Sequence, residues 1–333
     1  MSEHREFEQV TAKAHANIAL IKYWGKRDEQ LFLPMNSSLS ITLDKFYTET
    51  SVHFCEDLKA DVFIFNKCIA NVAETNKVSR YLDHIRKMAG VERYAMVQSI
   101  NYVPTAAGFA SSASGYAALS SAAARAIGLD VDEKKLSQLA RIGSGSASRS
   151  IFGGFVEWTK GNLDDGSDCY ARQIEEESYW DLCILAIQLS DKKKSISSRA
   201  GMKHTVETSP FYNIWVKEAE KDLGLLKDAL QQKDFERFGH VTESNALKMH
   251  ATTLGANPPY WYWEAGTISV MNQVRQLRDS GVLAFFTMDA GPNVFVICQQ
   301  KDKEVVENTL LTLDEIEQIY VCQPGPGVTY LSK

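Results

Sequence analysis

Apolar positions in the first half of the chain gather in short segments rich in β-branched and aromatic residues, a pattern typical of strands. These segments cover residues 10–23, 39–43, 48–54, 61–65 and 94–100. Segments of helical character lie at residues 74–89, 116–127 and 132–141. Each of these helices is expected to end close to a glycine, namely Gly90, Gly128 and Gly143.

Longer amphipathic segments dominate the second half of the chain. Strands are expected at residues 182–189, 283–287, 294–298 and 319–322. Helices are expected at residues 208–231, 234–249, 265–280 and 303–313. Because strands and helices mix without strict βαβ alternation, the pattern predicts an α+β fold and not a doubly wound parallel sheet.

Length and composition refine this fold. The 333 residues are many for one core and sufficient for two lobes. With 44% hydrophobic and 23% charged residues, the chain is expected to form packed cores and not to be disordered. No linker rich in proline, glycine or serine is evident, so the lobes are expected to be joined without a flexible tether.

Charge and targeting signals exclude several partners. No segment approaches the roughly 18 uncharged apolar residues of a membrane span, and residues 1–9 lack the apolar region of a signal peptide. We therefore expect a cytoplasmic protein without a membrane partner. The net charge of −6 argues against a nucleic-acid partner. The six cysteines form no C-x-x-C pair, so free thiols are expected, and not a disulfide framework or a zinc site.

The segment at residues 104–115 carries the strongest candidate chemistry. Small residues and three serines lead directly into the alanine-rich helix. Small side chains allow backbone N–H groups to approach a phosphate, and the first turn of a helix offers unpaired donors at a positive dipole end. The P-loop pattern is absent. The residues alone are equally typical of a serine-capped helix whose small side chains serve close packing.

A second candidate lies at the end of the first predicted strand. Lys22 and Lys26 are an even number of residues apart, so a regular strand would direct both ammonium groups to one face, although Gly25 can bend it. Two cations on one face suit a polyanionic ligand. The alternative is a strand that ends in two solvated lysines.

Two further segments are compatible with anion binding. Ser144, Gly145 and Ser146 precede Arg149, and an arginine can bind a carboxylate through two parallel hydrogen bonds. The same residues are also typical of an ordinary loop. The lysine-rich segment at residues 191–199 is equally typical of a solvated loop.

The last candidate is Asp289, which follows an apolar strand and precedes Gly-Pro-Asn. An aspartate in this setting is usually a turn former. At the rigid end of a strand it can also project into a cleft and serve as a general base.

These five segments, in this order, resemble the motifs of the mevalonate diphosphate decarboxylases, a family of the GHMP small-molecule kinase superfamily. The matching text is Asn-Ile-Ala-x-x-Lys-Tyr-Trp-Gly-Lys at 17–26, Pro-x-x-x-Gly-x-x-Ser-Ser-Ala at 104–113, Ser-Gly-Ser-x-x-Arg-Ser at 144–150, Ser-Arg at 198–199 and Asp-Ala-Gly-Pro-Asn at 289–293. The resemblance implies the GHMP kinase fold, with a lobe like domain 2 of ribosomal protein S5. It also implies an ATP-binding lobe at residues 1–182, a second lobe at 183–333 and an active-site cleft between them.

The resemblance assigns roles to named residues. Its catalytic set is Asp289, Lys22, Arg149 and Ser111. Its substrate contacts are Tyr23, Trp24, Gly25, Lys26, Ser144, Gly145, Ser146, Arg149, Ser198 and Arg199. Its nucleotide contacts are Ser99, Pro104, Ala107, Gly108, Ser111, Ser112, Ser114 and Lys194. Either Ser111 or Ser112 is expected to bind the Mg²⁺ that accompanies ATP.

The implied reaction is the ATP-dependent conversion of mevalonate diphosphate to isopentenyl diphosphate in isoprenoid biosynthesis, carried out by a homodimer. A relative that stops at phosphorylation, or one that decarboxylates the monophosphate, is the first alternative. The presence of Lys22, Arg149 and Asp289 together favours decarboxylation. The second alternative, a binding protein without catalysis, is disfavoured because the aspartate and the serine-rich loop are both intact.

Overall fold

The computed structural model describes residues 7–104, 111–190 and 195–332, and its fold is α+β as the sequence predicts. A large mixed sheet has the strand order β14-β1-β4-β7-β5-β6, with β8 paired to β4 and β9 paired to β8. Its strands are β1 (Val10–Ile21), β4 (Ser38–Cys55), β5 (Val62–Phe65), β6 (Cys68–Ile69), β7 (Tyr94–Asn101), β8 (Phe155–Trp158), β9 (Ala171–Glu175) and β14 (Thr329–Leu331). A small hairpin of β2 (Lys26–Asp28) and β3 (Leu33–Pro34) follows β1.

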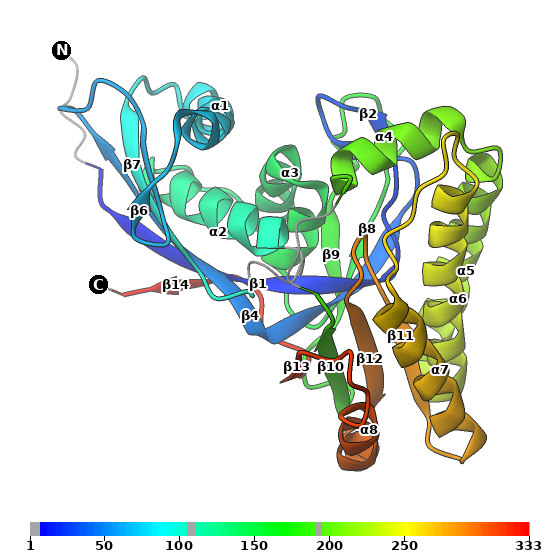
Figure 1. Ribbon diagram of the computed structural model, residues 1–333. Coiled ribbons are helices and arrows are strands. Elements are labelled where there is room, and N and C mark those ends of the chain that lie inside the picture. The colour runs from blue at the N-terminus through cyan, green and yellow to red at the C-terminus, as the bar shows by residue number, and fades with distance from the viewer. Residues whose placement is uncertain (1–6, 105–110, 191–194, 333) are drawn as a thin grey trace.

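Three helices cover one face of the large sheet: α1 (Val72–Ala89), α2 (Ser111–Ala126) and α3 (Glu133–Gly143) (Figure 1). The alanine-rich α2 packs closely on β1 and β4 because its side chains are short, and Ala113, Ala117 and Ala122 are fully buried. A 3₁₀ segment, Gly145–Ile151, follows α3. The two strands expected at 39–43 and 48–54 are one strand, β4. The polar Asp44 and Lys45 interrupt the apolar pattern but not the backbone pairing.

The second sheet is antiparallel, in the order β11-β12-β10-β13. It comprises β10 (Leu182–Gln188), β11 (Ala284–Thr287), β12 (Val294–Gln299) and β13 (Gln318–Cys322). Alternate residues of β10 face opposite cores. Ile184 packs in a core shared with β1 and β4 of the large sheet, whereas Leu185 faces α7 (Ala265–Asp279) and α8 (Lys303–Leu310). The shared core joins the two sheets without a flexible tether.

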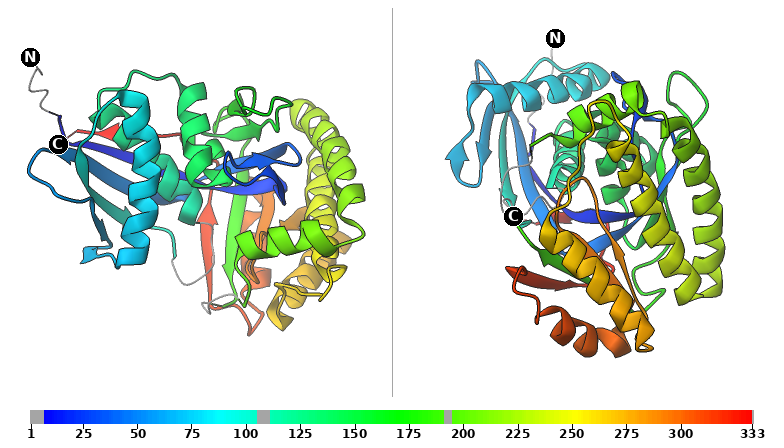
Figure 2. Two further views of the ribbon diagram at one scale, coloured as in Figure 1. Left: turned by 90° about the horizontal axis from the view of Figure 1, so that it is seen from above. Right: turned by 45° about the vertical axis from the view of Figure 1, so that its right-hand side comes forward.

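Helices α5 (Tyr212–Gln232) and α6 (Phe235–Leu254) lie side by side along the edge of the molecule away from β14 (Figures 1 and 2). Both contribute to the core that the sheets share. The helix expected at 208–231 is in fact preceded by a separate helix, α4 (Ser198–Thr208). Pro210 explains the break, because proline disfavours helical backbone at the residue before it.

The end of the described chain returns to the large sheet. Strand β14, which the sequence pattern did not reveal, pairs antiparallel with β1, with Thr11 opposite Leu331. The second half of the sequence therefore contributes one strand to the sheet of the first half. The division into lobes at residues 182 and 183 stays a prediction.

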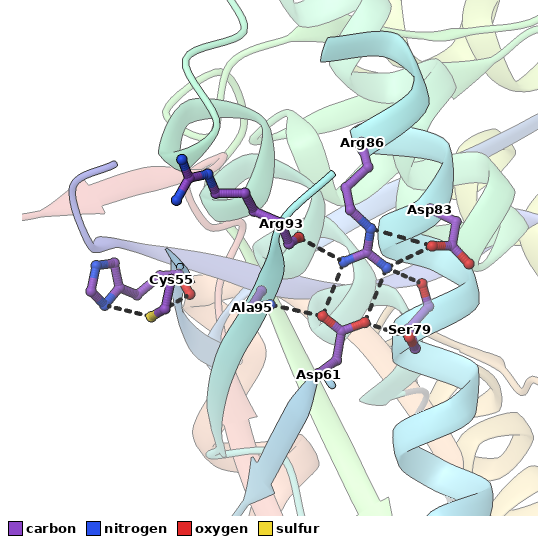
Figure 3. Close-up of polar contacts among 8 residues, drawn as sticks. Cys55, Asp61, Ser79, Asp83, Arg86, Arg93 and Ala95 are labelled. Carbon is purple, nitrogen blue, oxygen red and sulfur yellow. Dashed lines mark hydrogen bonds and ion pairs between the residues drawn. The ribbon is translucent and has the colours of Figure 1, made fainter. Parts of the chain in front are cut away.

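A buried ion pair holds α1 on the sheet, at the far end of the molecule from α5 (Figures 1 and 3). The Arg86 guanidinium donates to both carboxylate oxygens of Asp61, each at 3.0 Å. Asp61 also accepts from the Ala95 backbone N–H at 2.7 Å and from the Ser79 hydroxyl. Because Asp61 precedes β5, Ala95 belongs to β7 and Arg86 to α1, these bonds join three elements at one carboxylate.

The cysteines carry the free thiols that the sequence predicts. All six cysteines are free, and Cys183 and Cys298 are fully buried. No helix within residues 7–104, 111–190 and 195–332 is long and apolar enough to cross a membrane.

Candidate active site

A cavity of about 400 Å³ lies where the first β-strand, the start of α2, the 3₁₀ segment, α4, α6 and the end of β11 meet. Thirteen of the residues predicted as site residues line it: Lys22, Tyr23, Trp24, Lys26, Ser111, Ser112, Ser144, Gly145, Ser146, Arg149, Ser198, Arg199 and Asp289. Residues spread over most of the sequence thus converge on one cavity, whose lining comes from both sides of the predicted lobe boundary.

Lys22 and Asp289, which both line this cavity, form an ion pair. The Lys22 Nζ lies 2.8 Å from Asp289 Oδ1 and also donates to the Ala19 carbonyl at 2.7 Å. The lysine side chain is only 2% exposed, whereas that of Asp289 is 36% exposed. Desolvation lowers the pKa of Lys22, and the charge of Asp289 opposes that shift. The arrangement keeps a cation buried behind a carboxylate that lines the cavity.

Arg149 is the second buried cation of the site. Asn17 Oδ1 accepts from its Nη2 at 3.1 Å, and the Ser38 hydroxyl accepts from its Nη1 at 2.6 Å. Burial lowers the pKa of Arg149 to about 10, against the opposing effect of Asp289. Because neutral partners hold the guanidinium in place, its positive charge is available to an anionic group in the cavity.

Tyr23 contributes a buried hydroxyl. Its Oη has no hydrogen-bond partner within the described parts of the chain, and burial raises the pKa of this phenol. The ring packs edge to face on Trp158, with centroids 4.9 Å apart. A fixed ring with an unpaired donor beside a polar cavity is suited to bind a ligand oxygen.

Lys26 and Arg199 flank the aromatic ring of Phe32. The Lys26 Nζ lies 4.5 Å from the ring centroid and the Arg199 Cζ lies 5.2 Å from it. Lys26 also pairs with Glu29 at 2.6 Å. One cation comes from the β2–β3 hairpin and the other from α4, so the ring brings together positive charges from two separate elements.

Serine hydroxyls from α2 and the 3₁₀ region form a row in the cavity lining. Ser112 lies in the first turn of α2, and its Oγ is 3.3 Å from the Ser144 Oγ. The Ser144 Oγ is in turn 3.3 Å from the Ser146 Oγ. A helix start lined with hydroxyl groups is suited to phosphate oxygens.

Four predicted site residues do not line the cavity: Gly25, Ser99, Pro104 and Ser114. The Ser99 hydroxyl pairs with that of Thr50 at 2.7 Å, and the Ser114 hydroxyl pairs with that of Thr48 at 2.8 Å. Ala107, Gly108 and Lys194 lie outside the described residues.

Gly25 acts on the site through its backbone. Its φ is +105°, and an added Cβ would overlap the Tyr212 hydroxyl. That hydroxyl donates to the Trp24 carbonyl at 2.8 Å. A residue other than glycine would therefore displace the segment that carries Tyr23 and Lys26.

The cavity also contains residues that the sequence did not identify as site residues. Asn17, Phe32, Tyr116, Met202 and Met249 line it. Asn17 is the most informative, because it is 4% exposed and holds Arg149. A polar amide within the apolar strand text at 10–23 was the available signal.

Hydroxyl groups, not a preformed carboxylate cage, are the available ligands for a divalent cation. No group of three or more histidine, cysteine or acidic side chains that could hold a metal occurs in residues 7–104, 111–190 and 195–332. Ser111 and Ser112 offer oxygen donors beside the cavity. This set fits Mg²⁺, which commonly uses few protein ligands and takes the remainder from phosphates and water.

The α+β fold, the serine-lined helix start and the buried ion pair define an ATP-dependent enzyme of the GHMP kinase type. Family models match both halves of the chain. The diphosphomevalonate decarboxylase-like N-terminal domain matches residues 14–171, and the mevalonate 5-diphosphate decarboxylase C-terminal domain matches residues 184–324.

Individual proteins agree with these models. The diphosphomevalonate decarboxylase of Ganoderma lucidum is 37% identical over 324 residues, which cover 90% of this chain and 80% of that protein. The mevalonate diphosphate decarboxylase of Staphylococcus aureus superposes with a TM-score of 0.94 at 45% identity, covering 98% of each chain. A structure described as MDDEF in complex with MVAPP, AMPPCP and magnesium has a TM-score of 0.92 at 48% identity, covering 98% of this chain and 99% of that one. The chain belongs to the diphosphomevalonate decarboxylase family.

Proposed function

We propose that this chain catalyses the ATP-dependent decarboxylation of (R)-5-diphosphomevalonate to isopentenyl diphosphate, with release of ADP, phosphate and CO₂. The observation that carries the proposal is the meeting of Asp289, Lys22 and Arg149 in one cavity of a chain that belongs to the decarboxylase family. The three groups match the tasks of the reaction. Asp289 activates a hydroxyl group, Lys22 orients Asp289, and Arg149 directs a carboxylate.

Asp289 accepts the hydrogen bond of the tertiary 3-hydroxyl group and assists the loss of its proton as the new O–P bond forms. Lys22 holds the carboxylate oriented through their 2.8 Å ion pair. A general base must lie within hydrogen-bond reach of the proton that it removes. Asp289 lines the cavity and is partly exposed, so a hydroxyl group of a bound substrate can come within reach of its carboxylate.

Arg149 binds the C1 carboxylate of the substrate. A tertiary hydroxyl is a poor leaving group, whereas its phosphate ester is a good one. When the C3–O bond breaks, positive charge develops at C3. The C1–C2 bond then breaks, its electron pair forms the alkene between C2 and C3, and C1 leaves as CO₂. Positioning and electrostatics supply most of the rate in such reactions.

The diphosphate end of the substrate is bound by hydroxyls and cations on the facing walls. Tyr23, Ser144, Ser146 and Ser198 provide hydroxyl groups, and Lys26 and Arg199 provide the positive charges. The unpaired Tyr23 hydroxyl supports this assignment, because a buried donor without a partner gains a full hydrogen bond when the ligand enters.

The start of α2 is suited to the phosphates of the nucleotide. Ser111 and Ser112, which line the cavity, would orient the γ-phosphate, and one of the two would bind Mg²⁺. The cation would supply neutralisation of phosphate charge for phosphoryl transfer. A solved relative was described with AMPPCP and magnesium, which supports this cofactor pair for the present chain. The roles of Ser99, Pro104, Ala107, Gly108, Ser114 and Lys194 as nucleotide contacts, of Trp24, Gly25 and Gly145 as substrate contacts, and the homodimer and the cytoplasmic location stay predictions.

Counting products tests the function. Purified protein is incubated with ATP, Mg²⁺ and mevalonate diphosphate labelled at C1, and released CO₂ is measured against ADP. One CO₂ per ADP, with isopentenyl diphosphate as the product, is expected. ADP without CO₂ would make the protein a kinase, and neither product with ATP bound would make it a binding protein. The same assay with mevalonate monophosphate separates the two decarboxylase substrates.

A further inference from the structure

The backbone of Lys22 is held on both sides by buried amide side chains. Lys22 follows the last residue of β1, and its N–H donates to Asn245 Oδ1 at 2.8 Å. Its carbonyl accepts from Asn36 Nδ2, also at 2.8 Å. Both asparagines have no exposed surface. The peptide groups around the catalytic lysine are therefore fixed by side chains that solvent cannot replace.

The amide of Asn245 is itself held by a second buried side chain, Asp222. Its Nδ2 donates to Asp222 Oδ2 at 3.0 Å, and Lys248 Nζ lies 2.8 Å from Asp222 Oδ1. Asp222 is 4% exposed. A carboxylate can only accept here and the Lys22 N–H can only donate, so the amide has one possible orientation. The chain of contacts runs from Lys248 through Asp222 and Asn245 to Lys22.

These contacts join the first strand of the large sheet to helices α5 and α6. Asp222 belongs to α5, and Asn245 and Lys248 belong to α6. A second helix side chain also accepts from a backbone N–H of the first half: Glu220 of α5 accepts from the Ser37 N–H at 2.7 Å. Helices of the second half thus provide acceptors for backbone donors of the first half, beside the cavity.

We propose that Asn245 is a positioning residue for the reaction, which acts by fixing Lys22 and thereby the Lys22–Asp289 pair. The proposal rests on the function proposed above. Asn245 does not line the cavity, so its effect passes through Lys22. A carboxylate must be within a fraction of an ångström of its productive position, and a displacement of about 1 Å can reduce the rate about 100-fold.

The first test is Asn245→Ala, with kcat and KM measured separately. We expect kcat to fall about 10- to 100-fold with KM for both substrates within about twofold. The matched control is Thr242→Val, one turn earlier on α6. Thr242 is fully buried, and its hydroxyl has no partner in the described regions. The control is expected to retain wild-type kcat. An Asn245→Ala enzyme with unchanged kcat would overturn the proposal, whether or not its KM is raised.

A double-mutant cycle separates positioning through Lys22 from general damage to the fold. In a Lys22→Met background, Asn245→Ala is expected to change the residual kcat by less than about twofold, since the Lys22–Asp289 ion pair that Asn245 positions is already absent. An equal loss in both backgrounds would show that Asn245 acts independently of Lys22. Wild-type kcat in Lys22→Met alone would instead refute the role of Lys22 in the proposed function, so the two failures can be told apart.

A swapped pair tests the contact chain even where alanine impairs folding. Asn245→Asp combined with Asp222→Asn conserves charge and keeps an acceptor for the Lys22 N–H, with the Asp–Asn hydrogen bond reversed. We expect the double variant to recover at least about a third of the wild-type kcat and each single variant to remain lower. A folded double variant as slow as its singles would contradict the proposal.

Discussion

The Nζ of Lys22 lies 2.8 Å from Oδ1 of Asp289, although 267 positions separate the two residues in the sequence. Lys22 is almost fully buried and Asp289 is partly exposed to the cavity. Removal of water from the lysine lowers its pKa, while the carboxylate favours its charged form. The pair therefore connects a buried strand end to the one carboxylate among the residues described as lining the cavity.

Tyr23→Phe separates substrate binding from stability. We expect KM for the diphosphate substrate to rise about tenfold or more, because the lost hydrogen bond is to a charged group, with little change in kcat. The buried hydroxyl has no protein partner in the described chain, so the midpoint of thermal unfolding should be unchanged or slightly higher. Steady-state kinetics and thermal unfolding provide both values. A stable variant with wild-type KM would remove Tyr23 from the binding site.

Arg149→Lys is expected to reduce kcat/KM about 10- to 100-fold, because an ammonium cannot form the two parallel hydrogen bonds of a guanidinium with a carboxylate. Arg141→Lys is the matched control. Arg141 is also buried, but it donates to the Gly166 carbonyl at 3.0 Å and does not line the cavity. The control should lower the unfolding temperature and leave kcat/KM unchanged. Equal kinetic effects of the two variants would argue against a specific carboxylate contact.

His250 makes the fold sensitive to acid. Burial, with the nearby charge of Lys22, lowers its pKa from 6.5 to about 3. The unfolded chain takes up a proton below pH 6.5 and the folded chain does not, so stability falls as the pH drops from 6.5 towards 3. Between pH 7.5 and 5.0 this amounts to about 2 kcal/mol.

His250→Leu should therefore lose about 2 kcal/mol less of unfolding free energy than the wild type over that pH interval, as measured by urea unfolding at both pH values. His84→Gln replaces an exposed histidine of α1 and is expected to follow the wild type. Parallel losses in the wild type and His250→Leu would assign the acid sensitivity to other groups.

We expect the Asp61–Arg86 pair to stabilise the packing of α1 on the large sheet without contributing to catalysis (Figure 3). Arg86→Met leaves the Asp61 carboxylate buried without its counter-charge, which should cost about 3 kcal/mol of unfolding free energy. None of the residues in this network lines the cavity, so kcat and KM of the folded variant should match the wild type. Denaturant unfolding and steady-state kinetics test both statements, and a catalytic defect in the folded variant would contradict this separation.

The sequence predicted the longer strands of both sheets and most helices because their apolar periodicity is local, but it predicted none of the short strands β2, β3, β6, β8 and β9. It did not predict β14, whose three residues are all exposed and gain a partner only through pairing with β1. It also predicted no helix directly before residue 208, since α4 is stabilised by contacts distant in the sequence, such as that between Thr205 and Tyr260.

Much of the candidate site followed from the sequence because motif residues retain their order along the chain. Asn245 could not be predicted, since an asparagine inside an amphipathic helix has no local signal. Its importance arises from a contact across 223 residues. Asn17 was within a recognised segment, yet its role as a support for Arg149 depends on folding of the 3₁₀ segment against β1.

Asp289→Asn tests the central claim most directly, because it removes the base and preserves the shape of the side chain. We expect kcat to fall by about three powers of ten or more, by analogy with the loss of other essential acid–base groups, with little change in ATP affinity. Single-turnover release of labelled CO₂ and equilibrium ATP binding would be measured on the same preparation. A variant within tenfold of the wild-type kcat would contradict the role of Asp289 and the mechanism built on it.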